Sequence, residues 1–298
     1  MAPSFLPNTT TVAATSPPYP HVPPPWQLRG DVYLVAFWMP RSAVAAGLPA
    51  HAFSPLEARS DFAAPPGGAR PVGGLGMIQV IRYSESPVGP YDELIFVPGA
   101  WEWQRGGEGP KRRNPRITRI YVSQPFTCFN GRRNWGVPKH LARFDWATLP
   151  DGTTTVKVFP HDTIPSDTTE SSPSPIPLFQ ASFRPRIPYI PRFPFATYWA
   201  DYLGLSTTLV MPPLPENPHA SLGEIPASDR WYAIEPKEYS RQTSLGWVDL
   251  DQGEHRPRED CPNFWPGVGR WHLGVKMENA TIDFGFPTDS WEVPKSSL

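Results

Sequence analysis

Residues 131–141 of the chain read Gly-Arg-Arg-Asn-Trp-Gly-Val-Pro-Lys-His-Leu, and this stretch holds one lysine in a stiffened segment. The ring of Pro138 fixes its own backbone φ and biases Val137 toward an extended conformation. Gly131 and Gly136 permit turns or a close backbone approach that other residues resist. A lysine held in such a segment can serve as a nucleophile, although a solvated surface lysine is the more common use of this residue type.

A second segment bears on the role of that lysine. Residues 86–93 read Ser-Pro-Val-Gly-Pro-Tyr-Asp-Glu and end in the carboxylate of Glu93. Together with the Gly-Arg and Pro-Lys-x-Leu of residues 131–141, this segment resembles the active-site segments of the acetoacetate decarboxylase family, in the same order and at a similar spacing. The segment from Arg29 to Trp38, with Leu48-Pro49 after it, also agrees with the pattern of that family. The resemblance extends from Arg29 to Leu149 and is weak beyond.

The resemblance implies a lysine-based mechanism. In the family, the neutral amine of a lysine attacks a ketone and forms a protonated imine, through which a β-carboxylate leaves as CO2 or an aldol step proceeds. Carried onto this chain, Lys139 is the nucleophile and Glu93 is the acid or base. An unperturbed lysine has a pKa of about 10.4. The mechanism therefore needs surroundings that favour the neutral amine, such as an apolar pocket or a second cation nearby.

Further residues are candidates for contact with the substrate, on the resemblance and on residue type. They are Arg29, Gln79, Tyr91, Tyr121, Arg132, Trp135 and His140. The resemblance aligns Arg29 with, or one place from, an arginine that contacts the substrate carboxylate. Structural alternatives stay open: a strand-edge cation for Arg29, a salt bridge for Arg132, and core packing for the three aromatic residues.

Two positions depart from the pattern of the family. Its decarboxylases carry a second lysine directly after the first, where this chain has His140, whose unperturbed pKa of about 6.5 leaves it mostly neutral unless its surroundings shift it. A further glutamate of the family falls in the strand predicted at 75–83, where the chain has Ile78 and Gln79. Both departures weaken the case for acetoacetate and favour a larger, less charged ketone or a polyketide-like substrate.

Composition favours a mainly β fold. The chain has 298 residues, with 42 Pro, 23 Gly, 12 Trp and 16 Phe. Many prolines disfavour long helices, and such an aromatic content is not that of a disordered chain. We predict a mainly antiparallel β-barrel or sandwich with two or three short helices. The resemblance narrows this to the acetoacetate decarboxylase-like barrel or cone with an internal apolar pocket.

Apolar runs and turn residues place the predicted elements. Strands are predicted at 31–38, 75–83, 93–97 and 119–123, with a hairpin of 142–147 and 153–159 around Asp151-Gly152. Short helices are predicted at 40–47 and 195–203. Residues 1–25, rich in Pro, Thr and Ser, predict a disordered arm. Residues 26–298 predict a single domain with a loop insertion around 160–177.

Charge and cysteine content narrow the class of protein. The formal net charge of -1 gives no electrostatic case for nucleic-acid binding. The two cysteines and scattered histidines form neither a disulfide framework nor a local metal motif. We find no signal-peptide pattern and no apolar run of membrane-spanning length. We therefore expect a cytoplasmic enzyme that uses no metal and no cofactor. Its expected partner is a small-molecule carbonyl substrate, with neither nucleic acid nor membrane as a partner. The sequence leaves the oligomeric state undecided between a monomer and a homo-oligomer.

The sequence thus predicts a carbon–carbon lyase that forms a Schiff base between Lys139 and a β-keto acid or related carbonyl compound. Decarboxylation and aldol-type chemistry both fit this prediction, and secondary metabolism is a suitable setting. Two alternatives remain open. One is a pocket enzyme that forms no imine, such as a cyclase or isomerase of a polyketide-like metabolite, and the other is a non-catalytic small-molecule binding protein.

Overall fold

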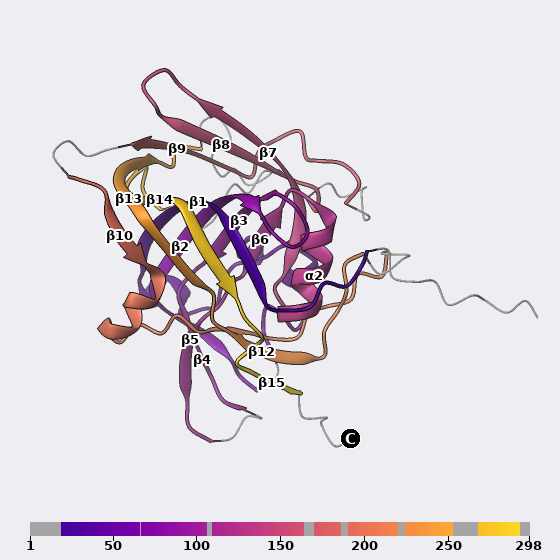
Figure 1. Ribbon diagram of the computed structural model, residues 1–298. Helices are drawn as coiled ribbons and strands as arrows, with labels where there is room; N and C mark the ends of the chain where they lie inside the picture. The colour runs from indigo at the N-terminus through magenta and orange to yellow at the C-terminus, as the bar shows by residue number, and fades with distance from the viewer. Residues whose placement is uncertain are drawn as a thin grey trace, which may run out of the picture.

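Runs of β-branched and aromatic residues form the strands that dominate the structure (Figure 1). The computed structural model describes residues 19–65, 67–105, 109–163, 170–185, 190–219, 224–252 and 268–292. Within this part of the chain, none of the helices has the length and apolar character that crossing a membrane requires.

Among the described residues, nine strands close into a barrel. Around the barrel the order is β1 (Trp26–Met39), β14 (Trp271–Phe284), β13 (Lys237–Asp249), β9 (Phe179–Pro185), β8 (Thr154–Pro160), β7 (Lys139–Thr148), β6 (Arg119–Val122), β3 (Tyr91–Val97) and β2 (Arg70–Glu85). The ring closes where β2 pairs with β1. The mainly β class predicted from composition is therefore confirmed.

The barrel is mainly antiparallel, as predicted, but one of its strand pairs is parallel, so the sheet is mixed. Strands β6 and β7 are parallel, with Ile120 opposite Lys139 and Val122 opposite Leu141. A parallel pair cannot be joined by a tight turn and needs a crossover connection. Here the crossover is the helix α2 (Pro125–Trp135), in a segment that the sequence analysis left without a helix.

Helix α2 begins and ends with residues that suit those positions. Pro125 lies in its first turn, where the missing N–H has no partner to lose, and the Gln124 side chain accepts hydrogen bonds from the N–H groups of Phe126 and Thr127. Gly136 ends the helix with a φ of 61°. The apolar periodicity gives no signal because most of the helix is buried, polar residues included.

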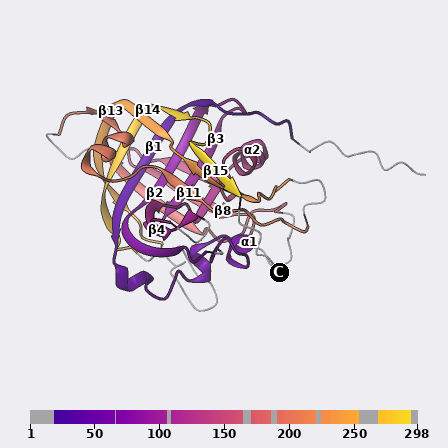
Figure 2. The same cartoon turned by 90° about the horizontal axis from the view of Figure 1, so that it is seen from below.

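Smaller elements lie outside the ring of nine strands. Strands β11 (Leu209–Met211), β12 (Arg230–Ile234) and β15 (Asp289–Glu292) form a second sheet, which lies beside α2 in Figure 2. Strand β4 (Ala100–Trp103) pairs with β2 and with β5 (Arg112–Pro115), and β10 (Phe193–Ala196) pairs with β13. The described part of the chain also has the helical turns η1 (Arg41–Val44), η2 (Ala50–Ala52), α1 (Pro55–Ala58) and η4 (Thr197–Leu203).

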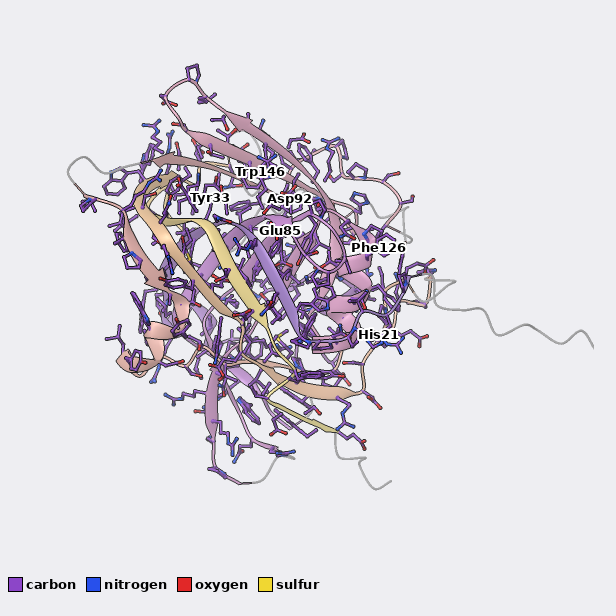
Figure 3. All side chains as sticks on the ribbon, in the orientation of Figure 1. His21, Tyr33, Glu85, Asp92, Phe126 and Trp146 are labelled. Atoms are coloured by element: carbon purple, nitrogen blue, oxygen red, sulfur yellow. The ribbon has the colours of Figure 1, made fainter. Side chains whose placement is uncertain are left out.

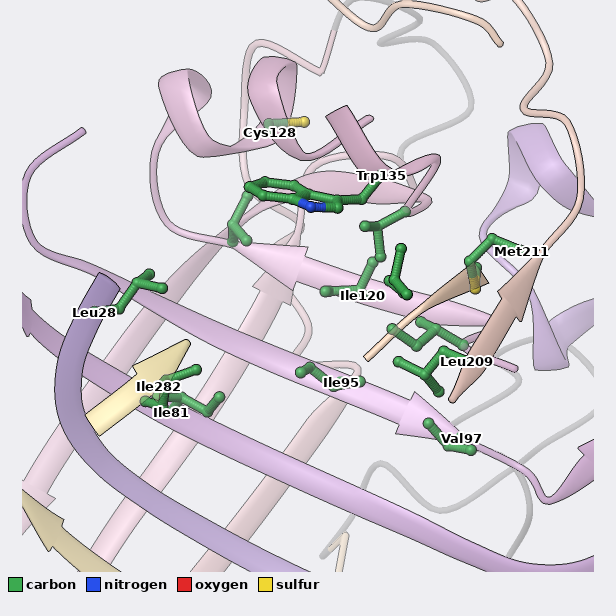
Figure 4. Packing of buried hydrophobic residues seen from close by; sticks show 14 of the residues in the cluster. Leu28, Ile81, Ile95, Val97, Ile120, Cys128, Trp135, Leu209, Met211 and Ile282 are labelled. Atoms are coloured by element: carbon green, nitrogen blue, oxygen red, sulfur yellow. The ribbon is translucent and has the colours of Figure 1, made fainter. Parts of the chain in front are cut away.

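Two apolar clusters occupy opposite faces of β2 and β3, because successive side chains of a strand point to opposite sides. Ile78 and Leu94 belong to the cluster that also draws side chains from β7, β8 and β9, and that cluster fills the barrel. Ile81 and Ile95 belong to the other cluster, which Trp135 of α2 covers in Figure 4. The candidate site lies on this second face.

The other predicted elements are recovered with different bounds. The strands predicted at 31–38 and 75–83 lie within β1 and β2, which are longer. Alternating buried and exposed residues continue β1 toward Trp26, and β2 begins at Arg70 because residues 70–73 pair with β4. The predicted helix at 40–47 is the single turn η1, and the one at 195–203 is η4 preceded by β10.

Part of the predicted arm is described. Residues 19–25 run beside α2, where Nε2 of His21 lies 2.7 Å from Oδ1 of Asn134 and Asn130 accepts from the N–H of Val22 (Figure 3). Residues 1–18 of the predicted arm and 164–169 of the predicted insertion lie outside the described residues. The domain division therefore stays a prediction.

Candidate active site

The backbone of Lys139 is fixed by the helix that precedes it. Lys139 is the first residue of β7. Its carbonyl oxygen accepts from Sγ of Cys128 at 3.2 Å and from Nη1 of Arg132 at 3.3 Å. Its side chain then passes Gly131, where an added Cβ would lie 2.6 Å from Cδ of Lys139. The sequence predicted that Gly131 permits either a turn or a close approach. The structure shows the close approach: the Lys139 side chain packs against the Gly131 backbone.

The ammonium of Lys139 lies among polar groups from three elements. Nζ is 2.6 Å from Oε2 of Glu93 on β3, and it donates to Oγ1 of Thr127 on α2 at 3.0 Å. It also lies 5.3 Å from the ring centroid of Tyr91. The hydroxyl of Tyr83 on β2 donates to the other oxygen of Glu93 at 3.0 Å. Lys139 is 6% exposed, so this ion pair is largely shielded from water.

The ion pair decides the protonation of Lys139. Burial lowers the pKa of this ammonium, but the neighbouring Glu93 carboxylate and Tyr91 outweigh burial, so its pKa lies above the ordinary value. Desolvation alone therefore does not produce the neutral amine that the sequence-based mechanism requires. Burial also raises the pKa of Tyr91 to about 12, so its hydroxyl keeps its proton at neutral pH.

An apolar cavity of about 510 Å³ adjoins the ion pair. Lys139, Glu93, Gln79, Tyr91 and Trp135 all line it, so the structure brings these predicted site residues together. The cavity lies on the face of β2 and β3 opposite the cluster that fills the barrel. A concave, mostly apolar space with a few convergent polar groups is the usual form of a small-molecule site.

Glu238 is a second buried carboxyl in this cavity, and it was not among the predicted site residues. It comes from β13, is 5% exposed, and its two carboxyl oxygens accept from Nε2 of Gln79 at 2.8 and 2.7 Å. Burial raises its pKa to about 7; the contact with Gln79 lowers it and the charge of Glu93 raises it further. Gln79, in the strand where a family glutamate was expected, thus holds a carboxyl from another strand.

The structure places the remaining predicted residues away from the cavity. Arg29 is exposed on β1, between the buried Leu28 and Gly30. Tyr121 points to the barrel face of β6, where its hydroxyl lies 3.1 Å from the Asp162 carboxylate. For both residues, strand alternation turns the side chain to the opposite face, which argues against the predicted contact with a substrate.

Arg132 and His140 belong to a buried ionic cluster rather than to the cavity. His140 contacts Glu57 through Nε2 at 2.7 Å and Glu170 through Nδ1 at 2.6 Å. Arg132 binds the other oxygen of Glu57 at 2.9 Å. Burial lowers the pKa of His140, but Glu170 and Glu57 outweigh it and raise that pKa well above its ordinary value. His140 is thus a cation, yet it follows Lys139 on a strand and faces away from it.

Three residues of the site had no sequence signal of their own. Thr127 depends on the helix that was not predicted, and its Pro125 start and Gly136 end were the available signal. Tyr83 lies on β2, two residues after Ile81, and Ile81 is the strand partner of Glu93. Its place beside Glu93 therefore depends on the pairing of β2 with β3. Glu238 lies outside the part of the chain that carries the resemblance.

Comparison of the sequence with known proteins finds one partial match. No model of a known protein family matches the chain. The rice (Oryza sativa subsp. japonica) protein NEOXANTHIN-DEFICIENT 1 is 31% identical over 122 residues, which is 41% of this chain. The match spans 34% of the length of that curated relative.

Two solved structures match nearly the whole chain at low sequence identity. Acetoacetate decarboxylase from Legionella pneumophila superposes with a TM-score of 0.54 and 12% identity, over 90% of this chain and 89% of that one. An acetoacetate decarboxylase-like enzyme from Sphingomonas wittichii gives a TM-score of 0.51 and 12% identity, over 90% and 93% of the two chains. The chain therefore has the acetoacetate decarboxylase-like fold, in a sequence that has diverged widely from both.

Proposed function

We propose that the protein is an enzyme that forms an imine between Lys139 and a ketone and so cleaves or forms a carbon–carbon bond. The observation that carries this proposal is the Lys139–Glu93 ion pair, shielded at the inner end of an apolar cavity. The shared fold with acetoacetate decarboxylases supports it, since both sequence segments that resemble that family meet at this pair.

The ion pair supplies the nucleophile by internal proton transfer. Because Nζ of Lys139 and Oε2 of Glu93 are 2.6 Å apart, the proton can pass to the carboxylate without movement of either side chain. The neutral amine attacks the carbonyl carbon, and Glu93 returns its proton as the oxygen leaves as water. Ammonium and ketone thus give a protonated imine and water, and the charge at the site is unchanged.

The protonated imine then accepts an electron pair. With a β-keto acid, the bond to the carboxylate breaks, CO2 leaves and the pair forms an enamine. Glu238, with a pKa of about 7, holds a proton in part of the molecules at neutral pH and lines the same cavity. We assign it the protonation of the enamine carbon, after which water hydrolyses the imine and releases the ketone.

A second candidate function follows from the raised pKa of Lys139. If the ammonium persists, it can polarise a carbonyl oxygen as a fixed hydrogen-bond donor, and the cavity would then serve an isomerase or cyclase without an imine. The two functions differ in one product: only the first leaves a covalent bond to Nζ after reduction.

Borohydride trapping separates them. The protein is incubated with 2-nonanone, a neutral methyl ketone, reduced with borohydride, digested and analysed by mass spectrometry. We expect the adduct on the peptide that contains Lys139. Lys157→Arg, at an exposed lysine of β8, is the matched control and should keep the adduct. Adducts confined to surface lysines would contradict the imine mechanism.

A further inference from the structure

The cavity has a buried inner end and an open outer end. At the inner end, Tyr83, Glu93 and Lys139 are buried. At the outer end, Trp38 is 72% exposed and Leu75 is 45% exposed, and these two residues are paired across β1 and β2. The space therefore runs along the strands from the ion pair to the surface.

The length of this path follows from strand geometry. Ile81 is the register partner of Glu93, and Leu75 lies six residues before Ile81 on β2. At about 3.3 Å per residue, the outer end is about 20 Å from the ion pair. We call this part of the cavity the outer arm; its walls include Ala36, Trp38, Leu75, Met77, Val97 and Leu205.

The outer arm offers little to a polar ligand. The polar residues that reach it direct their polar atoms to protein partners. Arg113 donates to Glu102 at 3.1 Å, and Ser206 accepts from Asn114 at 3.2 Å. The hydroxyl of Thr207 donates to Asp201 at 3.1 Å. The carboxyl and ammonium groups that can act on a carbonyl all lie at the inner end.

We propose that the outer arm is a binding subsite for a long apolar chain, so that the substrate is a long-chain ketone or β-keto acid with its carbonyl at Lys139. The position of the carbonyl rests on the proposed function, and the arm itself does not. Its continuity with the Lys139 end favours one elongated ligand over a second protein surface. Because the arm opens at the surface, a chain longer than the arm can extend past Trp38.

The experiment uses ligands that differ in chain length and in the carbonyl. Binding of butanone, 2-nonanone and 2-tridecanone is measured by calorimetry on the whole protein, and 2-tridecanol serves as a chain that cannot form an imine. Each buried methylene contributes about 0.8 kcal/mol, so affinity should rise by up to about fourfold per methylene while the chain stays within the arm. The alcohol should bind as well.

Variants of the arm give the matched comparison. Ala36→Trp fills the arm and should reduce the ratio of 2-tridecanone to butanone affinity by about tenfold or more. Ala147→Trp makes the same change at an exposed alanine of β7 that does not line the cavity, and it should leave the ratio unchanged. If Ala36→Trp does not fold, Leu75→Glu places a charge at the exposed rim and should reduce the same ratio.

Each result has a distinct meaning. Affinities that do not depend on chain length, or equal effects of Ala36→Trp and Ala147→Trp, would overturn the outer arm as a subsite. Chain-length dependence for both ketone and alcohol, without any trapped adduct at Lys139, would support the subsite and refute the imine mechanism alone.

Discussion

Gly131→Ala tests whether helix α2 positions the reactive amine. An added Cβ would lie 2.6 Å from Cδ and 2.8 Å from Cε of Lys139, whereas ordinary contacts begin at 3.4 Å. The side chain must therefore shift by roughly 0.8 Å, which is 3.4 minus 2.6. A misplacement of about 1 Å can cost about a hundredfold in rate. We expect imine formation to slow by about this factor.

The stability of the Gly131→Ala variant should change much less than its rate of imine formation. The displaced atoms belong to a flexible side chain, and alanine is favoured over glycine inside a helix by about 1 kcal/mol. We therefore expect little loss in the melting temperature of Gly131→Ala. The assay is the rate of borohydride-trapped 2-nonanone adduct, with thermal melting followed by circular dichroism. Gly269→Ala, where an added Cβ meets nothing within 4 Å, is the control. A folded Gly131→Ala variant that traps ketone as fast as the unmodified protein would refute the reasoning.

Three further predictions test the charged groups. Lys139→Arg should abolish the trapped adduct, because a guanidinium gives no neutral amine near neutral pH; residual turnover would favour the cation mechanism. Glu238→Gln should slow turnover by about a hundredfold and remove a step near pH 7 from the pH–rate profile; an unchanged profile would exclude this carboxyl as the proton donor. Burial raises the pKa of Glu57, but His140 and Arg132 hold it at about 2, below its ordinary 4.5. Its stabilising effect is thus present above pH 4.5 and is lost as the pH falls toward 2, and Glu57→Gln should lower the free energy of unfolding near neutral pH by about 3 kcal/mol. Urea titrations across that pH window should show a weaker acid dependence in the variant, and parallel curves would contradict it.

The central pair of the candidate site was predictable because each member lies in a local pattern. Lys139 follows a proline in one segment and Glu93 ends another, so the resemblance needs no long-range information. Glu238 lacks such a pattern: it stands between Lys237 and Tyr239, and an acidic residue beside a lysine is ordinarily solvated. Its burial depends on Gln79, a partner 159 residues away in the chain.

The class of the fold and its mainly antiparallel pairing were predictable, but the one parallel pair of the barrel was not. The strand segments predicted from apolar runs lie within β1, β2 and β3, because local composition governs strand formation there. The parallel pairing of β6 and β7 depends on recognising residues 125–135 as a helix, and their burial on nearly all sides removes the apolar periodicity. The salt bridge expected as an alternative for Arg132 is present with Glu57, but the role of His140 was missed, because the face of β7 that a charge occupies is set by partners distant in sequence.

Closure of the barrel has a consequence for the order of folding. Strand β1 pairs with β14, so Trp26 lies opposite Phe284, and both residues line the cavity. Contacts between such distant segments form slowly, because a long chain must be ordered before they do. During synthesis, Lys139 and Glu93 emerge long before β14, so the nascent chain has its reactive groups but lacks a wall of the chamber that shields them. The cavity beside the lysine thus gains Phe284, and with it part of its wall, only when the last barrel strand docks.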